Sequence, residues 1–191
     1  MPELKGTRTE HNLLASFAGE SQARMRYTYF AKVARKEGYR QLEAVFLETA
    51  ENEKEHAKRF FKHLEGGMVE IQAAYPAGVI GTTAENLKAA AAGENEEWTK
   101  LYPEFADVAD EEGFPQIAST WRNIAKAEER HEARYLYYLK QVEEGTFFKR
   151  DAPTRWKCGN CGYVHDGLEA PDLCPACLHP KEYFEEYLVK Y

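Results

Sequence analysis

The apolar positions in the first third of the chain repeat with the period of an α-helix. Over residues 9–37 and again over 39–65, apolar side chains recur three and four residues apart, which places them on one face of a helix. Gly38 and the pair Gly66-Gly67 follow these stretches, and glycine commonly ends a helix. The pattern therefore predicts two long helices. Their main apolar positions are Leu13, Leu14, Phe17, Ala18, Tyr27 and Phe30, then Leu42, Val45, Phe46, Ala50, Phe60, Phe61 and Leu64.

A second pair of helices follows after a long connection. Residues 68–82 read as an irregular segment, and helical patterns then cover residues 83–112 and 114–144. Pro103 lies inside the third helix, where it removes a backbone donor and kinks or locally distorts the helix. Two helical hairpins joined by one long crossover predict an all-α, ferritin-like four-helix bundle.

The two halves also carry similar residues at matching places. The offset is 74 residues from Glu20 to Glu94 and 75 residues from Glu53 to Glu128, so the second half has gained one residue. We expect a bulge or a local irregularity near Tyr102-Pro103, where the register changes. The matched acids and histidines are Glu20 with Glu94, Glu53 with Glu128, and His56 with His131.

These matched residues predict a site for two metal ions inside the bundle. Glu and His three residues apart share one face of a helix, and both halves place them in the second helix of the hairpin. One Glu-x-x-His is most often a solvated surface pair, but its recurrence with a matched Glu in the partner helix favours a buried cluster. Such charges are too costly to bury without cations. Oxygen-rich ligation with imidazole suits iron or manganese.

The repeat is broken at one acidic position. Glu97 lies one turn after Glu94, whereas its counterpart in the first half is Ala23. By the approximate twofold symmetry, Glu53 and Glu128 are placed to bridge the two metals, and Glu97 gives one metal an additional carboxylate. Alternatively, Glu97 is a surface acid or an acid that contacts a ligand without binding the metal.

The C-terminal residues carry a second candidate metal site. The four cysteines form two Cys-x-x-Cys pairs, a spacing that suits either a structural zinc or a single iron. A module of this size usually needs a bound metal or a similar cross-link to fold. We therefore predict a bundle over residues 1–146, a linker over 147–155 and a small metal-bound β module over 156–191. The cysteines are Cys158, Cys161, Cys174 and Cys177.

Composition and charge limit the kinds of partner that we expect for this chain. The net charge is −7 with intermixed signs, so no basic block argues for nucleic acid. No run approaches the roughly 20 apolar residues of a membrane span. The N-terminus lacks the apolar stretch of a signal peptide, and we expect a cytoplasmic protein.

The motifs together resemble the rubrerythrin family over essentially the whole chain. They are Ala-Gly-Glu20-Ser-Gln-Ala-Arg, Glu53-x-x-His56-Ala-Lys-Arg, Glu94-x-x-Glu97, Glu128-x-x-His131 and the two cysteine pairs. The resemblance implies a rubredoxin-like C-terminal domain and three irons per chain, which favours iron over zinc at the cysteines. The implied diiron ligands are Glu20, Glu53, His56, Glu94, Glu97, Glu128 and His131. Tyr27 and Tyr102 resemble phenols that hydrogen-bond the ligand carboxylates in the family, or they are ordinary core tyrosines.

The resemblance also implies a function in defence against oxidative stress. Family members reduce hydrogen peroxide to water with electrons from rubredoxin or an NAD(P)H-dependent reductase, relayed through the cysteine-bound iron. On reduction, one iron exchanges the ligand matching Glu97 for the one matching His56. The family forms homodimers, and the short linker favours electron transfer between subunits. The alternatives are a ferroxidase or iron-storage protein with the same bundle, and a simple electron carrier.

Overall fold

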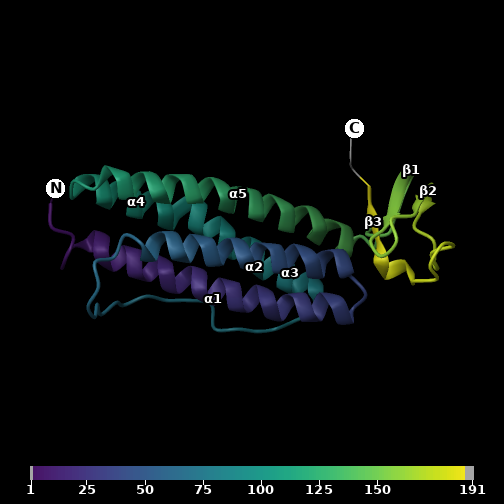
Figure 1. Cartoon of the computed structure of the whole chain (residues 1–191), viewed down its shortest axis with the longest axis horizontal. Helices are drawn as coiled ribbons and strands as arrows, with labels where there is room; N and C mark the ends of the chain where they lie inside the picture. The colour runs from purple at the N-terminus through teal and green to yellow at the C-terminus, as the bar shows by residue number, and fades with distance from the viewer. Residues whose placement is uncertain (1, 188–191) are drawn as a thin grey trace.

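The computed structural model, which describes residues 2–187, is a helical bundle with a small β-sheet at one end (Figure 1). The third helix expected from the sequence is divided into α3 (Thr83–Glu96) and α4 (Tyr102–Glu111), which are joined by a five-residue π-helix, η1 (Glu97–Leu101). The predicted four-helix bundle with one long crossover is confirmed. The helices are α1 (Arg8–Lys36), α2 (Arg40–Phe61), α3 (Thr83–Glu96), α4 (Tyr102–Glu111) and α5 (Pro115–Glu143).

The two hairpin turns of the bundle are near copies of each other. Gly38 between α1 and α2 has φ +83°, and Gly113 between α4 and α5 has φ +85°. This left-handed conformation favours glycine, which has no Cβ to clash. In each turn the residue after the glycine donates to the carbonyl five residues back, at 2.8 Å and 2.7 Å. The duplicated glycines thus set the same reversal in both halves.

The crossover runs along the outside of the bundle beside α1 (Figure 1). It begins earlier than expected, because α2 ends at Phe61 and not at residue 65. Tyr75 attaches it to α1 by donating from its hydroxyl to the carbonyl of Ala15 at 2.7 Å. A Cβ at Gly19 would lie 3.5 Å from the Tyr75 ring, so the small residue lets the segment lie close. At its end, Thr82 forms a capping box that starts α3.

The irregularity in the third helix is the π-helix at residues 97–101, which lies just before the predicted position at Tyr102-Pro103. Pro103 itself lies in the first turn of α4, where its missing N–H costs little because the register changes there. The additional residue of the second half is therefore absorbed as one wide turn. Both flanking helices keep their regular faces toward the core.

The bundle core consists of two apolar clusters. One contains Tyr27, Phe46 and Tyr135, and lies toward the end of the bundle that carries the sheet. The other contains Phe60 and Trp121, and lies toward the opposite end. Burial of such large side chains is the main source of stability in a helix bundle. The predicted metal-binding residues lie between these clusters.

The C-terminal module is a three-stranded antiparallel sheet in the order β2-β1-β3. The strands are β1 (Lys149–Cys158), β2 (Val164–Glu169) and β3 (Phe184–Glu186), and η2 (Lys181–Tyr183) is a short 3₁₀ helix. Most of the expected linker over 147–155 is therefore strand, because its backbone pairs with β2. Buried Trp156 and Phe184 form the module's own core with the cysteines.

The module packs on the end of the bundle through aromatic and charged contacts. The Arg40 guanidinium lies 4.1 Å from the centre of the Tyr183 ring, and the Tyr39 ring contacts Phe147 with centroids 5.0 Å apart. Arg150 donates to Gln141 of α5 at 3.1 Å. These contacts hold the module at the hairpin end of α1 and α2, away from the middle of the bundle (Figure 1).

Candidate metal centres

Four glutamates from four helices meet in the middle of the bundle. Glu20 of α1, Glu53 of α2, Glu94 of α3 and Glu128 of α5 are each 1% or less exposed. They point inward because each occupies an apolar-face position of its own helix, with neighbours three or four residues away in the core. The helical pattern that builds the bundle therefore also delivers the four carboxylates to one place.

Two histidines complete the group. His131 is 7% exposed, and the His56 side chain is 17% exposed. The six side chains form two groups of four whose nitrogen and oxygen atoms lie within 4.8 Å of one another. The groups are Glu20, Glu53, His56 and Glu128, and Glu53, Glu94, Glu128 and His131.

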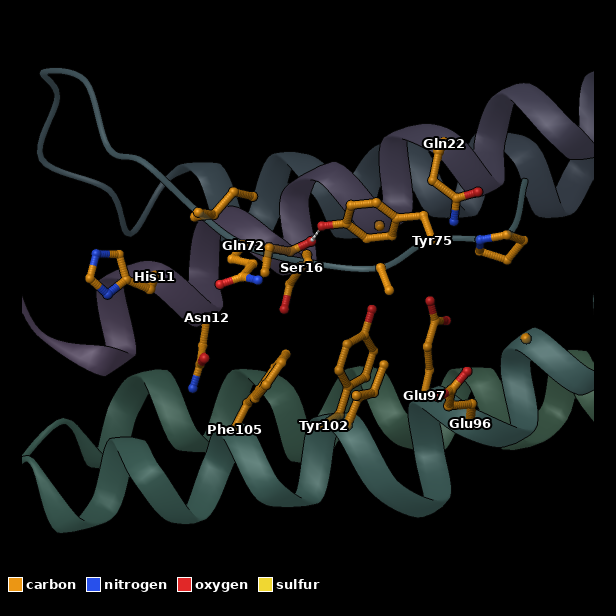
Figure 2. Close-up of a pocket in the computed structure, with 18 of the residues that line it drawn as sticks. His11, Asn12, Ser16, Gln22, Gln72, Tyr75, Glu96, Glu97, Tyr102 and Phe105 are labelled. Carbon is orange, nitrogen blue, oxygen red and sulfur yellow. Dashed lines mark hydrogen bonds between the residues drawn. The ribbon is translucent and has the colours of Figure 1, made fainter. Parts of the chain in front are cut away.

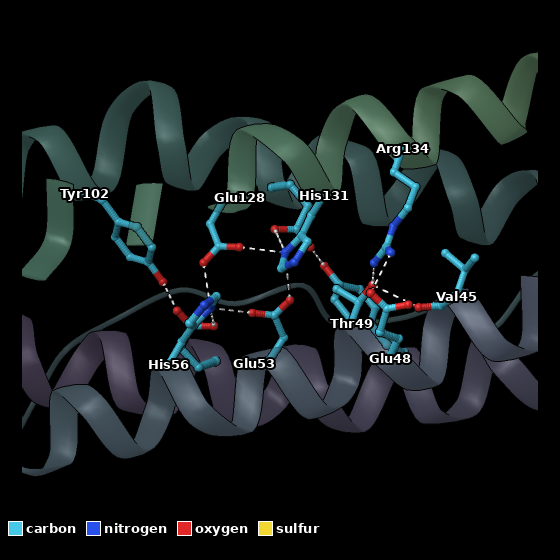
Figure 3. A network of polar contacts seen from close by, with 12 residues as sticks. Val45, Glu48, Thr49, Glu53, His56, Tyr102, Glu128, His131 and Arg134 are labelled. Atoms are coloured by element: carbon cyan, nitrogen blue, oxygen red, sulfur yellow. Dashed lines mark hydrogen bonds and ion pairs between the residues drawn. The ribbon is translucent and has the colours of Figure 1, made fainter. Parts of the chain in front are cut away.

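Glu53 and Glu128 belong to both groups, and their oxygens are divided between the histidines (Figure 3). Oε1 of Glu128 lies 2.8 Å from His56 Nδ1, and its Oε2 lies 2.7 Å from His131 Nδ1. Oε2 of Glu53 lies 3.1 Å from His56 Nδ1, and its Oε1 lies 3.3 Å from His131 Nδ1. Each of these carboxylates thus presents one oxygen to each side, as a bridge between two ions requires.

Hydrogen bonds within the protein leave several of these atoms unsatisfied. Both oxygens of Glu128, one oxygen each of Glu20, Glu53 and Glu94, and Nδ1 of His131 are buried without a hydrogen bond. Such atoms are costly to bury. Glu128 and His131 approach closely, yet neither atom has a hydrogen bond of acceptable geometry. Donor atoms that converge without bonding one another fit a cation held between them.

Without a cation, two of the four clustered glutamates favour binding a proton. Burial and repulsion by Glu53 raise the pKa of Glu94 to about 8. Burial, with repulsion by Glu53 and Glu128, also raises the pKa of Glu20 well above its ordinary value. Burial acts on Glu53 too, but its contacts with His131 and His56 outweigh burial and lower its pKa to about 2. Glu94 and Glu20 thus favour the protonated form near neutral pH.

The histidines are affected in the same direction by the surrounding acids. Burial lowers the pKa of His56, but Glu128 and Glu53 outweigh this effect and raise it to about 10. Burial likewise lowers the pKa of His131, and the carboxylates around it raise it to about 12. Both imidazoles are thus protonated at neutral pH unless a cation takes the place of the proton.

Two tyrosines connect the halves by exchanged hydrogen bonds. Tyr27 of α1 donates to Glu94 of α3 at 2.6 Å, and Tyr102 at the start of α4 donates a short hydrogen bond to Glu20 of α1. Each phenol therefore orients a carboxylate of the opposite half, leaving the other oxygen of each glutamate unpaired. Both tyrosines also pack in the apolar core. They are therefore core residues and also hydrogen-bond donors to the clustered carboxylates.

Glu97 lies beside the six-residue cluster and does not belong to either group of four. It begins the π-helix and lines a cavity of about 620 Å³ between α1, the crossover and α4 (Figure 2). Burial, with repulsion by Glu94, Glu128 and Glu53, raises its pKa well above the ordinary value. Of the seven expected ligands, the structure thus brings six together and holds the seventh at the edge.

The cavity is a feature that the sequence analysis did not identify. It is lined by Ser16, Gln22 and Arg26 of α1, by Tyr75 of the crossover and by Tyr102. The crossover has no regular pattern, so its path along α1 could not be read from its residues. The one feature of the sequence that could have indicated this path is the pair of small residues Ala15 and Gly19, which lie four apart on one face of α1 and let the crossover approach that helix.

The four cysteines come together within the module. The Sγ atoms of Cys158 and Cys177 are 3.7 Å apart, and those of Cys161 and Cys174 are 3.6 Å apart. A tetrahedron with metal–sulfur bonds of about 2.3 Å has edges of about 3.8 Å, so these separations fit one central ion. They are too long for disulfides.

The thiols also require a cation to become thiolates together. The backbone amide of His179 lowers the pKa of the Cys177 thiol to about 6. The backbone amide of Tyr163 lowers the pKa of Cys161, but the three neighbouring thiol groups outweigh it and raise it to about 12. One thiolate is therefore readily formed, whereas four at this spacing need a shared positive charge.

Comparison with known proteins agrees with both centres. The family model for rubrerythrin matches residues 11–139, and the model for the rubredoxin-like domain of rubrerythrin matches residues 156–185. The chain belongs to the rubrerythrin family. The resemblance predicted from the sequence is therefore confirmed, and the rubrerythrin relatives imply that the chain is an oxidoreductase.

The similarity to rubrerythrins extends over nearly the whole chain. Rubrerythrin of Porphyromonas gingivalis is 63% identical over 188 residues, which cover 98% of this chain and 94% of the relative. Rubrerythrin of Nitratidesulfovibrio vulgaris is 56% identical over 185 residues, which cover 97% of each. A solved structure of nigerythrin in its fully reduced, all-ferrous state matches with a TM-score of 0.63 and 31% identity, over 97% of this chain and 92% of that one.

Family membership and the two clusters agree on the metal content. A carboxylate site of the diiron type and a four-cysteine rubredoxin-like site are consistent with three irons per chain. The family thereby favours iron at the cysteines, where the spacing alone left zinc open. Within the described residues 2–187, no helix is long and apolar enough to cross a membrane.

Metal uptake at the carboxylate site is expected to release protons, because His56 and His131 retain theirs up to about pH 10 and 12 without a cation. At pH 7 we expect about two or more protons released per loaded site, and weaker binding as the pH falls. Calorimetry of ferrous uptake by chelator-treated protein, in buffers of different ionisation enthalpy, measures this number. A heat of binding that does not depend on the buffer would contradict the predicted protonation of the site.

Proposed function

We propose that this protein is a non-haem diiron peroxidase that reduces hydrogen peroxide to water in oxidative-stress defence. The observation that carries the proposal is the presence, in one chain, of a buried two-ion carboxylate site and a four-thiolate site. The first suits the two-electron chemistry of a peroxide, and the second suits one-electron transfer. Reduction of one peroxide consumes two electrons and two protons and yields two waters.

The proposed ligands follow from the two groups and from the family motif. When bound, the two irons supply the two electrons that break the O–O bond. Glu53 and Glu128, which belong to both groups, would be shared by the two ions, while Glu20 with His56 and Glu94 with His131 would each hold one ion. Glu97 is the seventh proposed ligand. The mononuclear iron is held by Cys158, Cys161, Cys174 and Cys177.

The cavity at Glu97 supports access for a small substrate. It reaches from the crossover to Glu97 and Tyr102, which lie next to the carboxylate cluster (Figure 2). Polar groups such as Gln22 and Arg26 line its wall, and Arg26 donates to Gln22 at 2.6 Å. A cavity of this character admits water and peroxide alike. The raised pKa of Glu97 places a proton-carrying carboxyl at its inner end.

The asymmetry at Glu97 supports a ligand exchange linked to the redox state. His56 and Glu97 both adjoin the group that holds Glu20, yet only His56 belongs to it in this structure. An anionic oxygen favours a ferric ion, and a neutral imidazole suits a ferrous one. We propose that Glu97 would hold one iron in its oxidised state and that His56 would replace Glu97 when that iron is reduced.

Electron delivery is proposed to cross between two copies of the chain. Glu53 lies 13 residues along α2 from Arg40, which contacts the module, and this separation corresponds to about 20 Å of helix. Because electron transfer slows steeply with distance, the same-chain module is poorly placed. A homodimer that sets one module beside the other subunit's diiron site removes this separation. The first donor is proposed to be a rubredoxin or an NAD(P)H-dependent reductase.

The second candidate is a ferroxidase or iron-storage protein, because such proteins share this bundle. The cysteine module argues against it, since iron storage does not need a one-electron relay. Stopped-flow mixing of the all-ferrous protein with hydrogen peroxide, and separately with oxygen, distinguishes the two. We expect oxidation by peroxide to be at least tenfold faster. Faster oxidation by oxygen would overturn the peroxidase proposal.

Replacing Glu97 by alanine tests the ligand exchange. The variant should still bind two irons, because the six clustered residues remain, but its turnover should fall by about tenfold to a hundredfold. Iron analysis and steady-state peroxide reduction measure the two properties. Glu104→Ala is the matched control, since Glu104 is exposed on α4 and does not line the cavity. Equal turnover of Glu97→Ala and Glu104→Ala would exclude the exchange.

Replacing Cys161 by serine tests the relay. A serine oxygen is a poor substitute for a thiolate, so reduction by an external protein donor should be lost. The diiron site, once reduced chemically, should still consume one peroxide per site at the rate of the parent protein. If the variant retained turnover with the protein donor, the cysteine-bound iron could not be the required relay.

A further inference from the structure

The π-helix allows two Glu–Tyr spacings of different length to give the same arrangement of side chains in the two halves. In the first half, seven residues separate Glu20 from Tyr27, whereas eight separate Glu94 from Tyr102. Both tyrosines nevertheless reach the glutamate of the opposite half. The additional residue is therefore taken up between them by the wide turn at residues 97–101. Glu97, which lines the cavity, begins that turn.

A wide turn of this kind requires support from outside the helix. π-helices are rare, and they persist as single turns where their surroundings stabilise them. Glu132 of α5 supplies such support with both of its oxygens. Its Oε1 accepts from Asn95 Nδ2 at 3.0 Å, and its Oε2 accepts from Trp98 Nε1 at 2.5 Å.

The two donors enclose Glu97 in the sequence. Asn95 lies two residues before it and Trp98 directly after it, so one carboxylate holds a side chain on each side of Glu97. Glu132 is also the residue after His131 on α5. The contact therefore connects the wide turn to the helix that carries one of the clustered histidines.

The first half of the chain contains no equivalent contact. At the corresponding offsets, Glu132 is replaced by Ala57, Asn95 by Ser21 and Trp98 by Arg24. Alanine cannot accept a hydrogen bond from its side chain, and α1 continues as a regular helix there. We call the two hydrogen bonds of Glu132 with Asn95 and Trp98 the clamp. The clamp and the wide turn occur together in the second half of the chain, and the first half has neither.

We propose that Glu132 is a positioning residue that holds the wide turn and thereby keeps Glu97 directed into the cavity. This inference rests on the proposed function only in giving Glu97 a redox role. Loss of the clamp frees the turn to shift toward regular α-helix, which rotates Glu97 away from its present direction. Glu132 itself touches neither substrate nor metal.

Glu132 joins α5 to Asn95 of α3 and Trp98 of the π-helix, and the matched control is an ion-paired contact of α5 with the next segment, α4. Arg122 of α5 pairs with Asp107 at 3.0 Å and with Asp110 at 2.7 Å, both on α4. It joins the same two sides of the bundle but lies away from the wide turn. The variants are therefore Glu132→Ala, Glu132→Gln and Arg122→Ala, each in the full chain.

Amide hydrogen exchange of chelator-treated protein tests the clamp without using activity. We expect exchange over residues 97–102 to rise about tenfold in Glu132→Ala and to remain at the parent level in Arg122→Ala. Glu132→Gln should fall between them, because its carboxamide keeps only one acceptor oxygen. Exchange at the parent level in Glu132→Ala would overturn the inference, whatever the peroxidase activity.

The iron-loaded protein tests the connection to Glu97. Glu132→Ala should lower kcat for peroxide and shift the diiron reduction potential in the same direction as Glu97→Ala, whereas Arg122→Ala should change neither. Faster exchange with an unchanged potential and kcat would refute the positioning role. If the parent protein reduces no peroxide, the proposed function fails, but hydrogen exchange and the potential still decide whether Glu132 positions Glu97.

Discussion

The burial of four carboxylates and two imidazoles at the centre of an apolar bundle is the constraint on which the rest of the structure depends. Glu20, Glu53, Glu94 and Glu128 are essentially inaccessible to solvent, and carboxylates at such positions are stable only with protons or cations. Apolar clusters on both sides keep water out along the bundle axis, and the low polarity there strengthens the interaction with a bound ion. Stability of the bundle and affinity for metal are therefore coupled.

The second determinant is the broken symmetry between the halves. The symmetric part accounts for two groups of four side chains that share Glu53 and Glu128. One additional residue in the third helix, absorbed as a π turn, sets Glu97 beside these groups without displacing Tyr102 from its glutamate. A small local irregularity thus alters the surroundings of the cluster while the packing of the bundle stays regular.

The cysteine module has its own core and its own cation requirement, and it packs at the end of the bundle rather than beside the carboxylates. This placement separates the four-cysteine centre from the carboxylate centre within one chain. The proposed transfer of electrons between two copies of the chain answers this separation.

The sequence by itself determined the helices, the crossover, the six clustered residues and the four cysteines, because helical periodicity and metal-ligand spacing are local patterns repeated in both halves. It was wrong about the end of α2, and it did not reveal that strand β1 begins at Lys149, within the expected linker, where pairing with β2 decides the conformation. Only the tertiary structure decided the division of carboxylate oxygens between the histidines, the exchanged tyrosine hydrogen bonds, the cavity under the crossover and the contact of Glu132 with the wide turn. Each depends on side chains distant in sequence that packing alone brings together.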